Sequence, residues 1–162
     1  MKLIKYLPTL ISTTNVTDDT ANLNKNRSFA HIFFIMPKAL KIKDKANRQL
    51  IETIIDGLQD VKAKDVVVLD LTSLKHAVTD YFIIASGDSS TQVEGMASSV
   101  VRKTRKELKE KPWHEEGVGN SEWILLDYVN VVVHIFFRET REFYNLEDLW
   151  ADAKRTEIEN VQ

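Results

Sequence analysis

Two stretches of the chain repeat their apolar residues with helical spacing. The first begins near Ala46 and places apolar side chains at i, i+4, i+8 and i+11, which is one face of a helix; its members are Leu50, Ile51, Ile54, Ile55, Leu58 and Val61. The second predicts another helix through Val93, Met96, Ala97, Val100, Thr104 and Leu108. Two capping-box pairs, Ser89 with Gln92 and Thr91 with Glu94, mark its start.

Between and after these helices lie continuous runs of β-branched and aromatic residues, which are typical of buried strands. They cover residues 66–71, 81–85, 122–128 and 131–137. A last helix is predicted with Asn145 as its N-cap and with Leu146, Leu149, Trp150 and Ala153 on one stripe. The order helix, strand, strand, helix, strand, strand, helix predicts a single α/β domain with a mixed sheet and flanking helices.

The periodic region defines the expected domain boundaries. Residues 46–153 form the domain, and residues 154–162 are expected to be a charged C-terminal tail. Residues 36–45 read as a basic leader that starts at a methionine. Residues 1–35 are polar over much of their length and lack periodicity, so they are expected to be a disordered or non-native extension.

Composition narrows the classes of function. The chain has 162 residues, 22 basic against 24 acidic, and no cysteine. The missing cysteines exclude a disulfide scaffold, a cysteine nucleophile and thiolate zinc sites, and they fit a cytoplasmic location. No apolar run reaches the roughly 18 residues that a membrane span needs. Residues 36–162 carry a net charge of −4, which predicts little direct contact with RNA.

Four groups of residues are candidates for chemistry. The turn around Gly87 lies between a strand and a helix, where backbone amides can hold a phosphate. A nucleotidyltransferase-like enzyme using this turn is the alternative function, but such enzymes need a nearby carboxylate pair and the next acids are Glu94 and Glu107. A helix cap is therefore the favoured interpretation of the turn.

The other three groups have simpler explanations. His114 with Glu115 and Glu116 lacks the further ligands of a metal site, so no metal is expected. Acids and a threonine at strand ends favour turns over catalysis; they are Asp70, Thr79 and Asp80. A basic set is interleaved in sequence with Glu107 and Glu110 and is expected to be a solvated helix face; its members are Arg102, Lys103, Arg105, Lys106 and Lys109.

The two last strands can form a hairpin with Val129 and Asn130 as a two-residue turn. Alternation then places one mixed set of side chains on a common face: Trp123, Leu125, Asp127, Val132, His134 and Phe136. Aromatic residues combined with an acid and a histidine are typical of a partner-binding surface. Helices covering both faces of the sheet remain an equal alternative.

Four segments, in this order, resemble the ribosomal silencing factor (Iojap-like) family: TDYFIIASG (79–87), QVEGMASSV (92–100), WILLDYVNVVVHIF (123–136) and EFYNLEDLW (142–150). The resemblance covers roughly residues 47–150 and implies a mixed five-stranded fold related to nucleotidyltransferases but without their catalytic carboxylates. It implies a translation repressor with no enzymatic activity and no cofactor. The family's docking tryptophan corresponds to Trp123, whereas its usual Gly-Asp at the hairpin turn is replaced here by Val129 and Asn130.

The resemblance also implies a partner. Family members bind the large ribosomal subunit through ribosomal protein L-fourteen and block joining of the small subunit, and organelle members take part in large-subunit assembly.

Overall fold

A six-stranded mixed sheet organises the protein, with strand order β3-β4-β5-β2-β1-β6. The structure, a computed structural model, describes residues 44–160; the expected extension 1–35 and nearly all of the basic leader lie outside these residues. The strands are β1 (Lys64–Asp70), β2 (Tyr81–Gly87), β3 (His114–Glu116), β4 (Trp123–Asp127), β5 (Val131–Phe137) and β6 (Lys154–Glu157). Only the central β2–β5 pair is parallel.

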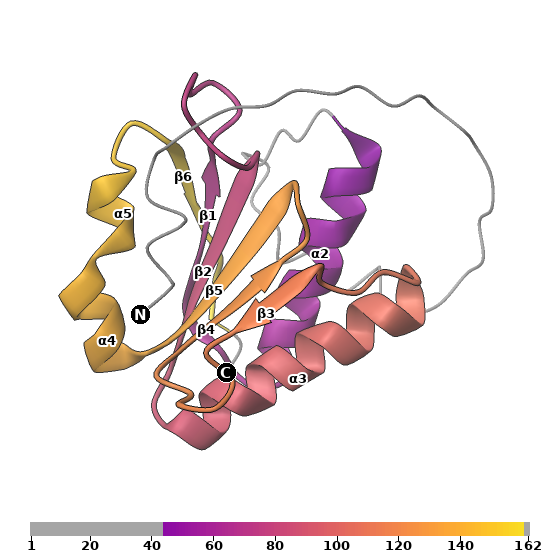
Figure 1. Cartoon of the computed structure of the whole chain (residues 1–162), viewed down its shortest axis with the longest axis vertical. Helices are drawn as coiled ribbons and strands as arrows, with labels where there is room; N and C mark the ends of the chain where they lie inside the picture. The colour runs from indigo at the N-terminus through magenta and orange to yellow at the C-terminus, as the bar shows by residue number, and fades with distance from the viewer. Residues whose placement is uncertain (1–43, 161–162) are drawn as a thin grey trace.

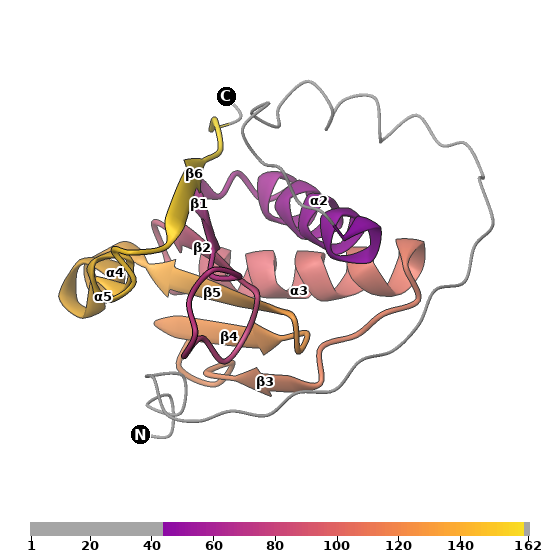
Figure 2. The ribbon, with the colours of Figure 1, turned by 90° about the horizontal axis from the view of Figure 1, so that it is seen from above.

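Helices lie on both faces of this sheet (Figures 1 and 2). On one face are α2 (Lys45–Gln59) and α3 (Ser90–Glu107), which pack against each other. On the other are two short helices, α4 (Arg138–Tyr144) and α5 (Leu146–Leu149). Each face of the sheet therefore has its own apolar core. In Figure 2 no helix from residues 44–160 covers the second face over β3 and β4. No helix within residues 44–160 is long and apolar enough to cross a membrane.

The amphipathic stripes predicted for the two long helices are confirmed. Nearly all of the predicted apolar positions of α2 and α3 are buried or packed against the first core. Asp44 caps α2 by accepting from the Ala46 N–H, and Ser89 caps α3 by accepting from the Gln92 N–H at 3.1 Å. Thr91 lies inside α3, so only the first of the two predicted capping pairs is used.

Gly57 lets α2 and α3 approach closely, and a β-carbon there would lie 2.9 Å from the Val100 Cα. We expect Gly57→Ala to lower the free energy of unfolding by about 1–3 kcal/mol, because the clash is with backbone and outweighs the roughly 1 kcal/mol of helix propensity that alanine adds. Urea denaturation measures the change. Gly119→Ala is the control, since no neighbouring atom within residues 44–160 comes within 4 Å of its β-carbon position. A Gly57→Ala protein as stable as the parent would contradict this account.

The hairpin register is as predicted. Trp123 pairs with Phe136, Leu125 with His134 and Asp127 with Val132, which confirms that these six share a face. The turn has two residues, but Val129 rather than Asn130 takes the positive φ, at 74°. Two hydrogen bonds hold it there: the Val129 N–H donates to Asp127 Oδ1 at 2.7 Å and its carbonyl accepts from the Thr79 hydroxyl at 3.0 Å.

Three expectations need correction. The sheet has six strands instead of five, because the short polar segments β3 and β6 form its edges. Residues 154–157 therefore belong to the domain as β6, and the next residue, Ile158, is buried in the core; a charged tail cannot begin at 154. The last helix is broken at Asn145, whose φ of 42° and ψ of 57° separate α4 from α5. Asn145 makes no side-chain cap, and Leu149 is exposed.

Candidate partner-binding face

The predicted partner-binding set divides into buried and accessible residues. Four members have 0–1% of their surface exposed and cannot touch a partner in this conformation: Leu125, Val132, His134 and Phe136. The C-terminal segment supplies Leu146, Trp150 and Ala153 to the same core. The open face expected for these four is therefore wrong. Trp123 and Asp127 are half-buried and remain accessible.

Trp123 lies on the boundary between the core and the surface. Its ring stacks on Phe136, with centroids 4.7 Å apart, and contacts Tyr144 of α4 at 4.8 Å. Its indole N–H donates to Nδ1 of His134 at 3.3 Å. The core thus holds one face and the N–H edge of the indole, while this half-buried side chain keeps part of its surface accessible to a partner, an arrangement typical of an aromatic anchor.

His134 is a neutral core residue. Its burial lowers the pKa to about 3, because the charged imidazolium loses its hydration. Since Nδ1 accepts from Trp123, the ring proton of the neutral form lies on Nε2. Nε2 has no hydrogen-bond partner among residues 44–160, and the Phe82 ring stands edge-to-face at 4.7 Å. His134 therefore orients the Trp123 ring by accepting its indole N–H from within the core. A histidine in this state does not act as a general base.

Two aromatic side chains outside the predicted partner-binding set are more exposed than the aromatic members of that set. Phe143 and Tyr144 on α4 are 81% and 45% exposed, and with Trp123 they form a continuous cluster that we call the aromatic edge. Pattern analysis missed both α4 residues because α4 buries no side chain and so has no apolar stripe. The density of aromatic residues in the EFYNLEDLW segment was the available signal.

A pocket of about 330 Å³ lies on the same face at the hairpin end of the sheet. It is lined by Val78, Trp113, His114, Asp127, Val129 and Val132. Trp113, which precedes β3, is 84% exposed. Asp127 at this pocket and Trp123 at the aromatic edge are four residues apart on one strand, which is about 13 Å. The two features together form one surface beside the open β3–β4 half of the sheet.

The other candidate sites have structural roles. At the Gly87 turn, Gln92 Oε1 accepts from the Asp88 N–H at 2.8 Å, and the Asp88 carboxylate pairs with Lys64 and Arg138. Asp70 closes a turn by accepting from Thr72. Within residues 44–160 there is no group of three potential metal ligands, and His114 lies only 3.8 Å from Glu116. These contacts confirm the cap and turn interpretations of Gly87 and Asp70.

A family profile described as "ribosomal silencing factor during starvation" matches residues 44–162, all of the described domain. The chain belongs to the ribosomal silencing factor family. It is 34% identical over 116 residues to the ribosomal silencing factor of Halalkalibacterium halodurans, which covers 72% of this chain and 97% of the relative. The predicted family resemblance is confirmed.

Two further comparisons agree. A mouse relative named "mitochondrial assembly of ribosomal large subunit protein 1" is 34% identical over 103 residues, covering 62% of this chain and 44% of its own length. The crystal structure of a Chromobacterium violaceum protein superposes with a TM-score of 0.60 at 36% identity, covering 64% of this chain and 85% of that one. The mixed α/β fold is thereby confirmed. The names of the silencing-factor relatives describe a regulatory role in translation rather than an enzymatic one.

Proposed function

We propose that this protein represses translation by binding the large ribosomal subunit through ribosomal protein L-fourteen and by sterically blocking joining of the small subunit. The observation that carries the proposal is the family match over residues 44–162, which include all of the described residues. The name of the mouse relative, which is similar in sequence, connects that relative to assembly of the ribosomal large subunit and supports a large-subunit partner here. The protein acts with ribosomes in the cytoplasm and needs no cofactor.

The surface formed by the aromatic edge and the hairpin-end pocket is the proposed contact with the ribosomal protein. It supplies accessible aromatic groups at both ends: half-buried Trp123 with exposed Tyr144 at one, and exposed Trp113 at the other. Between them, His114 and Glu116 on β3 and Asp127 on β4 supply polar groups that fix the docking orientation. Aromatic anchors with interspersed polar groups are typical of protein–protein interfaces.

A steric block requires that the protein bind free large subunits and not joined ribosomes. A ligand that binds one state only shifts the joining equilibrium by its differential affinity. We expect tagged protein to co-sediment with separated large subunits, without added nucleotide, and to be absent from the small-subunit and joined-ribosome fractions. Addition of the protein before mixing the two subunits should lower the yield of joined ribosomes. Equal recovery on joined ribosomes and free large subunits would contradict the blocking mechanism.

A further inference from the structure

Positive charge is concentrated in one short part of an otherwise acidic domain. Residues 44–160 hold 15 basic and 22 acidic side chains, a net charge of −7. Residues 102–111, at the end of α3 and just beyond it, hold six basic and two acidic side chains, a net charge of +4. Of these, Lys103 is neutralised by Asp56 and Asp60 of α2.

Glu107, the acid that interrupts this run within α3, does not interrupt it in space, and Glu110 lies beyond the end of the helix. At about 100° per residue, Arg102, Arg105 and Lys106 fall within an arc of about 100° on α3, whereas Glu107 points about 140° away from Arg102. All three basic side chains are exposed, and we call them the basic patch. Within the described part of the chain, none of them has a carboxylate at ion-pair distance.

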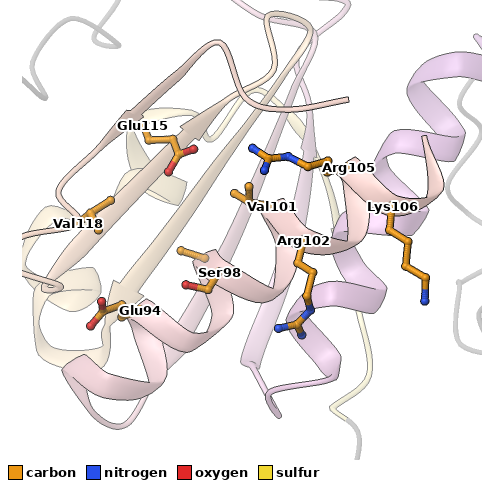
Figure 3. Close-up of a pocket in the computed structure, with 9 residues that line it drawn as sticks. Glu94, Ser98, Val101, Arg102, Arg105, Lys106, Glu115 and Val118 are labelled. Carbon is orange, nitrogen blue, oxygen red and sulfur yellow. The ribbon is translucent and has the colours of Figure 1, made fainter. Parts of the chain in front are cut away.

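The patch borders a shallow groove of about 420 Å³ between α3 and the β3 side of the domain (Figure 3). Ala97, Val101 and Val118 form its apolar part. Figure 3 shows Arg105 extending toward β3, while Arg102 and Lys106 project from α3 away from it. Glu94 lies eight residues before Arg102, about 12 Å along the helix axis, so the basic end of the groove is separate from this acid.

We infer that the basic patch binds the phosphate backbone of ribosomal RNA beside the proposed protein-docking site. This inference rests on the proposed function, which places the domain on the large subunit, a particle that contains RNA. Unpaired cations on an acid-free arc are complementary to a polyanion, and guanidinium groups match phosphate geometry. RNA repels the acidic remainder of the domain, so contact through one patch restricts the orientation of the domain on the RNA.

An acidic protein segment is the other anionic occupant to consider. RNA is favoured because the lining of the groove includes Glu94 and Glu115, which a carboxylate-rich peptide filling the groove would have to approach. A phosphate backbone that crosses only the outer side of α3 meets Arg102 and Lys106 without entering the groove. Net charge predicted little RNA contact for the whole domain. With this inference, that prediction applies to the surface outside the basic patch.

The test compares two variants with equal charge changes. The patch variant carries Arg102→Gln, Arg105→Gln and Lys106→Gln; the control carries Lys45→Gln, Lys154→Gln and Arg155→Gln, exposed cations away from the patch. Large-subunit affinity is measured against salt concentration. Each lost phosphate contact lowers the slope of log K against log salt by about 0.7–0.9, so the patch variant should lose about 2 from the slope and the control much less. Equal slopes for the two variants would overturn the inference.

A second measurement separates this inference from the proposed function. Binding to protein-free large-subunit RNA at low salt should fall at least tenfold in the patch variant and stay unchanged in Trp123→Ala. If the protein bound RNA through the patch but did not bind large subunits, the proposed function would be refuted while the inference about RNA would stand. A photo-crosslinker at Ser98, which is exposed beside the patch, should label RNA. Labelling of a ribosomal protein only would overturn RNA as the occupant.

Discussion

Replacement of Trp123 by alanine is expected to weaken large-subunit binding about thirtyfold, the effect of losing about 2 kcal/mol from an aromatic anchor. Stability should also fall, by about 2 kcal/mol, because the ring stacks on Phe136 and donates to His134. A fully buried tryptophan would cost about 3–5 kcal/mol, but Trp123 is only half-buried. Thermal unfolding and co-sedimentation measure the two effects separately.

A control must lose stability without touching the docking surface. Val100→Ala serves, because Val100 is fully buried in the core on the opposite face of the sheet. It should unfold at a lower temperature than the parent and bind large subunits as the parent does, measured well below its melting temperature. If Trp123→Ala stays folded and retains full affinity, Trp123 is not part of the docking surface.

The second large effect is a loss of stability in mild acid caused by His134. Its pKa is about 3 in the folded protein and about 6.5 when unfolded, so the unfolded state binds the extra proton between these values. The folded state therefore keeps its full stability above pH 6.5, where His134 is neutral in both states. Stability is lost as the pH falls from 6.5 toward 3. Between pH 6.5 and 5, where most carboxylates remain ionised, this histidine should lower the free energy of unfolding by about 2 kcal/mol.

Urea denaturation at a series of pH values measures this slope. His134→Gln keeps an acceptor for the Trp123 indole N–H but has no titratable ring, so its stability should change much less over the same interval. His114→Gln, which removes an exposed histidine, should retain the parent's slope. A parent protein equally stable at pH 6.5 and pH 5 would show that His134 is not buried as a neutral ring.

Periodicity along the chain was sufficient to predict the elements that bury apolar residues. The 3.6-residue stripes located α2 and α3, and Ser89 followed by Gln92 located the start of α3. Alternation in β4 and β5 predicted the pairing of Leu125 with His134. It therefore also predicted which side chains lie on each face of the sheet. These features are local, because a period of two or 3.6 decides which side chains point the same way.

The composition of the hairpin face could not decide whether that face is open, because this depends on a segment distant in sequence. Asn145 in a left-handed conformation ends α4 and lets Leu146 and Trp150 pack over the sheet. The edge strands β3 and β6 are short and polar, so they have no apolar alternation and form only because β4 and β1 offer them hydrogen-bonding partners. Local periodicity was therefore enough to predict which residues share a face. Which face is covered, and which aromatic residues stay exposed, followed only from packing between segments far apart in the chain, because burial depends on such contacts.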